Sequence, residues 1–334
     1  MTAPESSPPE SPPLLAILGP TASGKSALAI HLAQQFNGEV IACDSTQLYR
    51  GFDIGTGKPT VAERRGIPHH LLDVLNPEEE ATAGGYREMA IAVLEDIRAR
   101  KRLPILTVGT GLYMRALFEG LADLPQRSEE LRTRLRASVA KHGEAHLHRL
   151  LKRLDPRSAN RIAQADTQKL LRAVEVCVLA RRPLTEVHNQ GRNPLQGWRI
   201  IKIGLQPERE QLYERIHARI DHMLAQGWQG EVTHLMAETF AENHKEGTAR
   251  ELAKPFDFLG YRELAAVSRN DLSLAEARTA IQQSTRRYAK RQQTWFRREQ
   301  NVTWFAGFGD QPQLQTEIVQ WLKLCSGGSS DPCL

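Results

Sequence analysis

The chain has 334 residues, 40% of them hydrophobic and 25% charged, with a formal net charge of +5. This composition is typical of a soluble globular protein with one large and one smaller domain. No apolar run approaches the ~18 residues that a membrane helix needs, so no membrane-spanning helix is expected.

The cysteines and the terminal sequences predict the cellular compartment and the ordered part of the chain. The cysteines form no C-x-x-C pair, which argues against a disulfide framework or a zinc site: Cys43, Cys177, Cys325 and Cys333. Reduced thiols in the cytoplasm are expected. Residues 1–13 are rich in Pro and Ser and lack the pattern of a signal peptide, so we expect them to be disordered. Residues 323–334 are expected to form a flexible tail.

In chain order, three short apolar runs predict buried strands over residues 14–20, 38–45 and 103–111. Helical patterns follow the first run at residues 24–36 and precede the third at 86–102. This alternation predicts an α/β fold with a doubly wound parallel sheet, which binds its ligands at the carboxyl ends of the strands. Each strand ends in polar or glycine-rich sequence: Gly19 to Ser26, Asp44 to Gln47 and Gly109 to Gly111.

The character of the sequence changes in the middle of the chain. Residues 125–195 show helical periodicity throughout and carry 15 Lys and Arg against 7 Asp and Glu. We therefore predict a basic helical insertion in a core formed by residues 14–124 and 196–322. A strand is expected near Trp198, and helices alone from Gln211 onward. The charge favours a polyanionic partner larger than a metabolite, although solvated helix faces would give the same pattern.

A phosphate-binding loop follows the first strand and opens the first helix. Its residues fit the motif G-x-x-x-x-G-K-[ST]: Gly19, Pro20, Thr21, Ala22, Ser23, Gly24, Lys25 and Ser26. In this motif backbone N–H groups surround phosphate oxygens at the positive end of a helix. Lys25 is expected to reach a terminal phosphate, and the Ser26 hydroxyl to bind Mg²⁺.

The acidic partner usual in P-loop ATPases is missing, because the third strand ends in Val108-Gly109-Thr110-Gly111. The best-placed acid is Asp44, after the second strand. The loop is therefore predicted to hold a pyrophosphate that leaves, with Asp44 as the base acting on the attacking group. Arg215 and Arg219 lie one helical turn apart and are candidates for a second cation near the leaving group.

Residues 281–299 predict an amphipathic helix. Its apolar side is expected to contain Ile281, Tyr288, Gln292, Trp295 and Phe296. Its basic side is expected to bind nucleic-acid phosphates, and contains Arg286, Arg287, Lys290, Arg291, Arg297 and Arg298. A solvated basic helix is the alternative. His69 and His70 form the only histidine doublet, which we interpret as part of a loop.

Seven ordered blocks resemble the tRNA dimethylallyltransferases, also called tRNA isopentenyltransferases. They extend over residues 14–305: GPTASGKS, DSTQLYRGFDIGTGKP, PHHLLD, GTGLYMRAL, RIDHMLAQG, LGYREL and YAKRQQTWFR. The resemblance implies a P-loop core related to nucleotide kinases, with a helical insertion that clasps the anticodon stem–loop of tRNA. It implies transfer of a dimethylallyl group from dimethylallyl diphosphate to the 6-amino group of the adenosine 3′ of the anticodon, in tRNAs that read codons beginning with U.

The resemblance also implies a role for each matching residue. The loop Gly19–Ser26 would hold the diphosphate, with Lys25 and Arg219 as its cations and Ser26 on Mg²⁺. Asp44 would be the general base, and Thr110 would contact the flipped adenosine. Further tRNA contacts would come from Asp44, Ser45, Thr46 and Gln47, from Gln168, Lys169, Leu170, Leu171 and Arg172, and, on the basic helix, from Arg287 and Lys290.

The sequence departs from the family pattern at Val108, where a glycine is usual, and in the segment 253–258. Two other functions share the same motifs. A prenyltransferase for free adenine nucleotides would need no basic insertion, and a non-catalytic RNA-binding protein would not need Lys25, Ser26 and Asp44 together. We expect a cytoplasmic enzyme that acts as a monomer.

Overall fold

The computed structural model describes residues 11–122, 124–143, 145–189, 192–246 and 253–325. The chain divides into two compact units, one formed by residues 1–117 with 196–334 and the other by residues 118–195. Most of the segments expected to be disordered or flexible, 1–10 and 326–334, lie outside the described residues.

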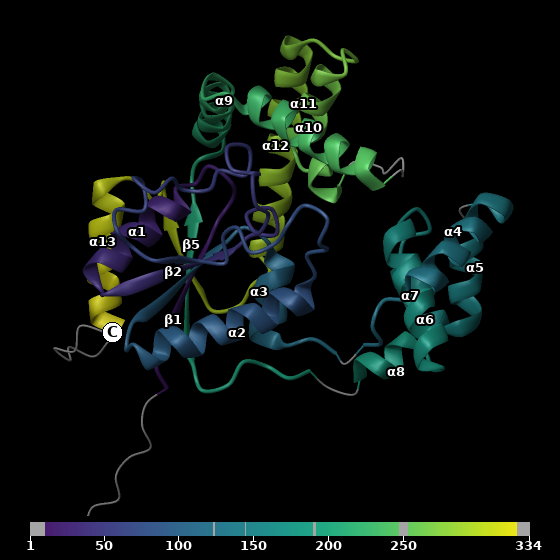
Figure 1. Ribbon diagram of the computed structural model, residues 1–334. Helices are drawn as coiled ribbons and strands as arrows, with labels where there is room; N and C mark the ends of the chain where they lie inside the picture. The colour runs from purple at the N-terminus through teal and green to yellow at the C-terminus, as the bar shows by residue number, and fades with distance from the viewer. Residues whose placement is uncertain (1–10, 123, 144, 190–191, 247–252, 326–334) are drawn as a thin grey trace, which may run out of the picture. The chain divides into compact units, whose positions relative to one another are not determined.

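The first unit contains a parallel sheet of six strands in the order β3-β2-β4-β1-β5-β6 (Figure 1). The prediction of an α/β fold with a parallel sheet is confirmed, and the sheet is that of a P-loop protein. The strand bounds are Pro13–Leu18 for β1, Gly38–Cys43 for β2, His69–His70 for β3, Leu103–Val108 for β4, Arg199–Gln206 for β5 and Val302–Ala306 for β6. Because β4 lies between β1 and β2, the ends of these strands meet at one edge of the sheet.

Alternation along the strands divides the buried side chains between two faces. Leu15 and Ile17 pack with helices α1 (Lys25–Gln35) and α13 (Pro312–Cys325) in one apolar cluster. On the opposite face α2 (Ala83–Ala99) packs against β4, with α3 (Gly111–Glu119) beside it (Figure 1). The remaining elements of this unit are α9 (Arg209–Ala225), α10 (Trp228–Glu246), the 3₁₀ helix η1 (Lys254–Asp257), α11 (Tyr261–Ser268) and α12 (Leu274–Phe296).

Four expectations about this unit are wrong. His69 and His70 form the edge strand β3, in which they pair with Val40 and Ile41 of β2. The helical prediction after Gln211 missed β6, whose five residues pair in parallel with β5. Such short strands show no periodicity of their own, so their strand conformation depends on pairing with a neighbouring strand. Pro13 begins β1 instead of ending a disordered segment, and α13 extends into the expected tail as far as Cys325.

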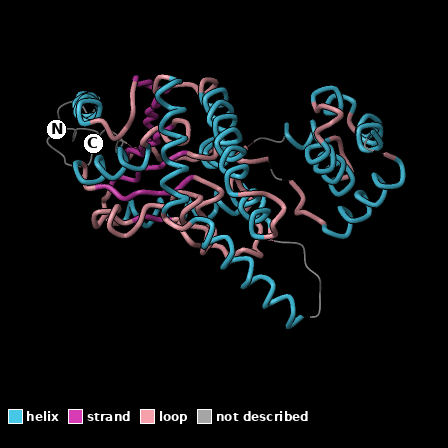
Figure 2. The backbone as a smooth tube through the Cα atoms, turned by 90° about the horizontal axis from the view of Figure 1, so that it is seen from above, coloured by secondary structure: helices cyan, strands magenta, loops and turns pink. Residues whose placement is uncertain are grey.

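The described residues of the second unit form helices joined by loops, with no strand (Figure 2). Their bounds are Glu129–His142 for α4, Ala145–Leu154 for α5, Pro156–Arg161 for α6, Thr167–Ala180 for α7 and Leu184–Asn189 for α8. Leu147, Leu151 and Leu170 form the centre of its apolar core. Glu175 is buried and accepts hydrogen bonds from Arg132, Arg172 and the backbone N–H of Ser128. These bonds offset the cost of burying a carboxylate.

No helix in the described part of the chain combines the length and the apolar character needed to cross a membrane.

Candidate active site

The phosphate-binding loop connects β1 to the first turn of α1, as the motif predicts. The backbone N–H of Thr21 donates to Oε1 of Gln292 at 2.7 Å, and the carbonyl oxygen of Ser23 accepts from the backbone N–H of Gly309 at 2.9 Å. The loop is thus fixed by residues near the C-terminal end of the unit. The first backbone N–H groups of α1 have no partner within the helix, so they are free to bind an anion.

Lys25 lies across this loop. Its Nζ donates to the carbonyl oxygens of Gly19 at 2.9 Å and Pro20 at 2.8 Å. Burial lowers the pKa of Lys25 to about 8, Asp44 raises it in part, and Arg219 lowers it further. A bound anion would favour the charged form of this amine, so the lowered pKa marks a position that a phosphate group can stabilise.

Asp44 follows the last residue of β2. Its Oδ1 accepts hydrogen bonds from the backbone N–H of Thr46 at 3.0 Å and from the Thr46 hydroxyl at 2.9 Å. Gly109, after β4, lies directly against the other carboxylate oxygen, since a Cβ at position 109 would be 2.0 Å from Oδ2. Asp44 therefore has a fixed orientation, with one oxygen held by its own turn and the other beside Gly109.

Arg219 lies on α9 beside Gly57. A Cβ on Gly57 would be 1.8 Å from Nη2 of Arg219, so the guanidinium packs directly on this turn. Burial lowers the pKa of Arg219, while Asp44 and Glu63 raise it. Arg215, the other candidate cation, instead forms an ion pair with Asp310 at 2.7 Å. Of the two arginines, Arg219 is therefore the one available to a ligand.

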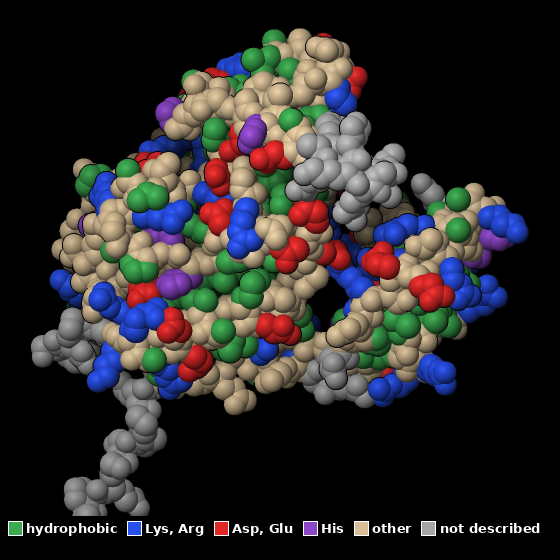
Figure 3. All heavy atoms as spheres, in the orientation of Figure 1, with side chains coloured by type: hydrophobic (Ala, Val, Ile, Leu, Met, Phe, Trp, Pro, Cys, Tyr) green, Lys and Arg blue, Asp and Glu red, His purple; other side chains and the backbone are tan. Residues whose placement is uncertain are grey.

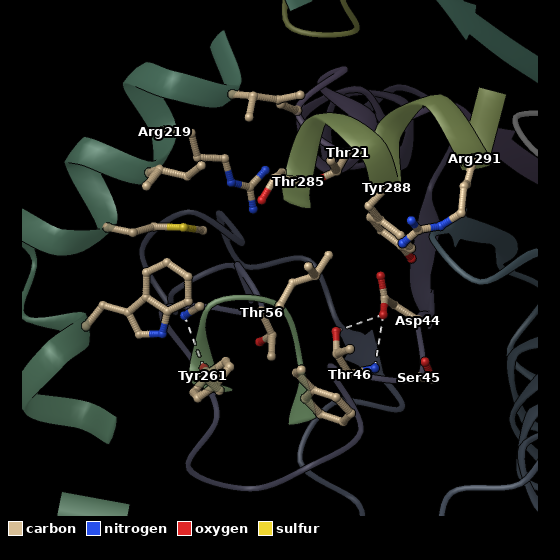
Figure 4. A pocket seen from close by; sticks show the side chains of 18 residues that line it. Thr21, Asp44, Ser45, Thr46, Thr56, Arg219, Tyr261, Thr285, Tyr288 and Arg291 are labelled. Atoms are coloured by element: carbon tan, nitrogen blue, oxygen red, sulfur yellow. Dashed lines mark hydrogen bonds between the residues drawn. The ribbon is translucent and has the colours of Figure 1, made fainter. Parts of the chain in front are cut away.

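Two adjoining cavities meet at Asp44 and Arg219, which line both of them. The smaller, of about 140 Å³, is lined by the loop residues Thr21 to Ser26 and is mainly polar. The larger, of about 300 Å³, is mainly apolar, with Ile216, Ile220, Met223, Trp228, Phe258 and Leu259 in its wall. Figure 4 shows Asp44, Tyr288 and Arg291 at one side of the larger cavity and Tyr261 at another. The arrangement suits a molecule with an anionic head and a small apolar group.

The segment after Asp44 contributes to both cavities. Ser45 and Thr46 line the larger one, and Gln47 lines the smaller one. Nε2 of Gln47 donates to the carbonyl oxygens of Thr56 and Gly57. Thr110 lines neither cavity, and its hydroxyl oxygen accepts from the backbone N–H of Ser45 at 3.0 Å.

The departures from the expected family pattern leave the cavities intact. Val108 is fully buried in the sheet, so its side chain takes no space at the ligand edge. In the segment 253–258, Phe256 packs on Phe52 with 5.4 Å between ring centroids, and Phe258 reaches the larger cavity. Both changes add apolar contacts without entering the phosphate-binding loop.

Helix α12 differs from its predicted two-sided pattern. Arg287 and Lys290 are exposed, as expected for a basic surface. Arg286 instead contacts His217 on α9 at 2.6 Å, and Arg291 lines the larger cavity. Trp295, expected on the packed side, is 38% exposed and lies under the guanidinium of Arg115. Arg297 and Arg298 follow the last helical residue, Phe296, so the helical projection does not apply to them.

The segment 168–172 in the second unit is only partly available to a partner. Leu170 and Leu171 are buried in the helical core, so their side chains face away from any partner, and the expected tRNA contact of this segment stays a prediction. Arg172 is bound to Glu175 at 2.7 Å, whereas Gln168 and Lys169 are exposed. Figure 3 shows many Lys and Arg side chains on this unit. Those that are exposed are Arg127, Arg134, Arg136, Lys141, Arg149, Lys152, Arg153, Arg157, Arg161, Lys169, Arg181, Arg182 and Arg192.

Sequence reasoning missed several residues of the site. Gln292 and Tyr288 were assigned only to the packed side of α12, yet both line the smaller cavity and donate to the carbonyl oxygen of Gly109. Glu231 accepts hydrogen bonds from the backbone N–H groups of Asp53 and Ile54, and from the Tyr261 hydroxyl at 2.6 Å. The one signal in the sequence was the polar Gln292 on the expected apolar side of the helix, and no pattern pointed to Glu231.

A metal ion at this site would take most of its coordinating oxygens from a bound phosphate compound and from water. Among the described residues, no three His, Cys, Asp and Glu side chains are grouped closely enough to hold a metal. Ser26 and Asp44 line the same polar cavity and offer a hydroxyl and a carboxylate. Hard divalent cations such as Mg²⁺ commonly combine one or two such protein oxygens with phosphate oxygens and water.

Comparison with known proteins identifies the family of the chain. The model of the family described as IPP transferase matches residues 47–299, and that described as Isopentenyl transferase matches residues 12–79. The tRNA dimethylallyltransferase of Koribacter versatilis is 49% identical over 312 residues, which are 93% of this chain and 98% of that protein. The corresponding protein of Solibacter usitatus is 47% identical, over 91% and 95%.

Solved structures show the same relationship. The tRNA isopentenylpyrophosphate transferase of Bacillus halodurans has a TM-score of 0.65 and 34% identity, covering 94% of this chain and 96% of that one. A eukaryotic dimethylallyltransferase acting on tRNA has a TM-score of 0.76 and 25% identity, covering 95% and 80%. The chain is therefore a member of the IPP transferase family, whose curated relatives are tRNA dimethylallyltransferases.

Proposed function

We propose that the protein transfers the dimethylallyl group of dimethylallyl diphosphate to the exocyclic 6-amino group of the adenosine 3′ of the anticodon in tRNA. The observation that carries this function is the position of Asp44 between a polar cradle and an apolar cavity, both of which it lines. A diphosphate and a five-carbon group need those two environments side by side. We infer tRNA as the acceptor because the curated relatives are named tRNA dimethylallyltransferases.

The diphosphate occupies the smaller cavity in this proposal. Its oxygens accept from the loop Gly19–Ser26 and face the cations of Lys25 and Arg219. The dimethylallyl group enters the larger cavity, against Ile220 and Met223 of α9. As the bond from carbon to the bridging oxygen breaks, its electron pair passes to the diphosphate, where the two cations stabilise the growing charge.

Asp44 acts on the nucleophile. The amine of adenine is weakly nucleophilic because its lone pair is delocalised into the ring. As the new bond from nitrogen to carbon forms, Asp44 accepts the proton that leaves the amine, which contributes roughly 10²–10⁴-fold. The products are isopentenyladenosine, diphosphate and a protonated Asp44. Thr46 fixes one carboxylate oxygen, so the other is left to take the proton.

Mg²⁺ fits this site through its oxygen ligands. The Ser26 hydroxyl and diphosphate oxygens would hold the ion, with Asp44 within the same cavity. Bound there, Mg²⁺ would offset part of the charge of the leaving diphosphate.

The acceptor is a nucleic acid in this proposal because the second unit presents an exposed basic surface. An adenosine in an anticodon loop is already single-stranded, so extruding it into a pocket costs only a few kcal/mol. Phosphate contacts from exposed residues such as Arg157 and Arg181 offset that cost.

One assay separates the proposed function from its alternatives. The protein is incubated with dimethylallyl diphosphate and Mg²⁺, together with either unmodified tRNA or AMP. Prenylated adenosine in tRNA alone is the expected result. Prenylated AMP would indicate a free-nucleotide prenyltransferase, and tRNA binding with no product in either reaction would indicate a non-catalytic RNA-binding protein.

A further inference from the structure

Gln292 joins the two halves of the candidate site through one side chain. Its Oε1 accepts from the backbone N–H of Thr21 at 2.7 Å, and its Nε2 donates to the carbonyl oxygen of Gly109 at 2.8 Å. The side chain is almost fully buried on α12, at 6% exposure. Both of its polar atoms are therefore used inside the protein.

The chemistry of these partners requires a side chain that offers both an acceptor and a donor, as an amide does. Thr21 presents a donor and Gly109 presents an acceptor, so only a side chain with one acceptor and one donor satisfies both. The same pairing defines which atom of the amide is oxygen. A carboxylate could accept from Thr21, but it would repel the carbonyl oxygen of Gly109.

The two partners belong to different parts of the reaction. Thr21 lies in the phosphate-binding loop and lines both cavities. Gly109 lies against Oδ2 of Asp44, and its backbone N–H donates to Cys43, which precedes Asp44. Gln292 therefore ties the loop that would hold the leaving group to the backbone beneath the base.

We propose that Gln292 is a positioning residue for prenyl transfer, which fixes the distance between the diphosphate cradle and Asp44. This inference rests on the proposed function, since it assigns the leaving group to the loop and the proton to Asp44. The same helix carries the exposed Arg287 and Lys290, so a tRNA bound to α12 would contact the element that sets this distance.

The test compares Gln292→Met, Gln292→Glu and the matched control Gln283→Glu, which makes the same charge change at an exposed position of α12. Single-turnover prenylation of tRNA is measured with saturating dimethylallyl diphosphate. We expect Gln292→Met to lower the rate roughly 10- to 100-fold, because small misplacements of reacting groups have effects of this size. The KM for dimethylallyl diphosphate should change by less than about threefold.

The pH dependence separates positioning from a structural role. Burial raises the pKa of a carboxyl group, and the carboxyl group of Gln292→Glu, once protonated, would again offer one donor and one acceptor. The rate of Gln292→Glu relative to the parent should therefore rise as the pH falls from about 8 to about 6. The rate of Gln292→Met relative to the parent should not change with pH. The rate of Gln283→Glu should equal that of the parent at every pH.

A flat ratio for Gln292→Glu, or a Gln292→Met rate within about threefold of the parent, overturns the inference while the parent remains active. An inactive parent overturns the proposed function, and the inference with it. If Gln292→Met does not fold, the ratio for Gln292→Glu still decides the question, because acid recovery requires the restored hydrogen bonds.

Discussion

Gly109 leaves no space between its α-carbon and Asp44, because a Cβ at that position would lie 2.0 Å from Oδ2 of the carboxylate. Gly109→Ala should therefore push Asp44 away from its hydrogen bonds with Thr46. We expect the single-turnover rate of tRNA prenylation to fall roughly 10- to 100-fold.

Binding of inorganic pyrophosphate should change less than the rate, since the atoms nearest to the new Cβ all belong to Asp44 and none to the phosphate-binding loop. Gly230→Ala is the matched control, because a Cβ there has open space around it. A Gly109→Ala enzyme with the parental rate would show that the orientation of Asp44 does not limit the reaction.

The pKa of Lys25, lowered to about 8 chiefly by burial, predicts a pH-dependent affinity for pyrophosphate. A bound anion raises this pKa, so binding requires uptake of a proton above pH 8 and no uptake well below it. The affinity should therefore fall as the pH rises through about 8, by up to one log unit per pH unit.

Titration calorimetry with pyrophosphate and Mg²⁺ at several pH values measures this dependence. Lys25→Met is the control, because it keeps the stem of the side chain and removes the titrating amine. The slope of log affinity against pH is measured for the parent and for Lys25→Met. The difference between the two slopes is the contribution of Lys25, because the titration of pyrophosphate itself affects both proteins equally. Equal slopes would exclude proton uptake by Lys25.

The Tyr261 hydroxyl stabilises the turn at residues 53–57. It donates to Glu231 at 2.6 Å and accepts from the backbone N–H of Gly55 at 3.1 Å. Tyr261→Phe leaves the Gly55 N–H without this partner, so unfolding should need about 1–3 kcal/mol less free energy. Urea denaturation measures the difference.

Tyr213→Phe is the matched control for Tyr261→Phe. The Tyr213 hydroxyl accepts from Arg209 in an exposed bond, so its removal should cost less than about 0.5 kcal/mol. Equal destabilisation of the two variants would contradict a structural role for the Tyr261 hydroxyl.

Much of the active site could be predicted from the sequence because its signals are local. The phosphate-binding loop and Asp44 each follow an apolar strand, and parallel strands bring such ends to one edge. The order β2-β4-β1 then places Gly109 between them. The position of the loop and of Asp44 at this edge needed no pairing information, whereas the position of Gly109 between them needed the strand order.

Other parts of the site depend on contacts between distant segments. Thr21 and Gln292 are 271 positions apart, so no local pattern could pair them. Periodicity predicted which side of α12 is polar. It could not show that Arg286 contacts His217 of α9 or that Arg291 lines the larger cavity. The interpretation of the segment 168–172 as an RNA contact came from resemblance alone, and no local pattern showed that the side chains of Leu170 and Leu171 pack in the helical core.

The exposed cations of α12 should bind tRNA phosphates in a sequence-independent way. Arg287→Ala or Lys290→Ala should weaken binding of all substrate tRNAs about equally. Each should also lower the slope of log affinity against log salt by about one. Arg278→Ala is the control on the same helix, because Arg278 is paired with Asp221. Unchanged slopes for Arg287 and Lys290 would leave α12 as a solvated basic helix.

Asp44→Asn separates chemistry from binding. Asparagine keeps the size of the side chain and an acceptor for the backbone N–H of Thr46, but it cannot take the proton of the amine. Turnover should fall roughly 10²–10⁴-fold. The affinities for dimethylallyl diphosphate and tRNA should change far less, because the lost interaction belongs to the transition state.

A Mg²⁺ series distinguishes a base from a metal ligand at Asp44. If Asp44 served mainly to hold Mg²⁺ near Ser26, added Mg²⁺ would partly restore Asp44→Asn, and the affinity for dimethylallyl diphosphate would fall with the substitution. If Asp44 is the base, the single-turnover rate stays low at every Mg²⁺ concentration while both affinities hold. Asp257→Asn, at an exposed position of η1, controls for the loss of one negative charge. Recovery with metal, or turnover within a few-fold of the parent, would exclude Asp44 as the proton acceptor.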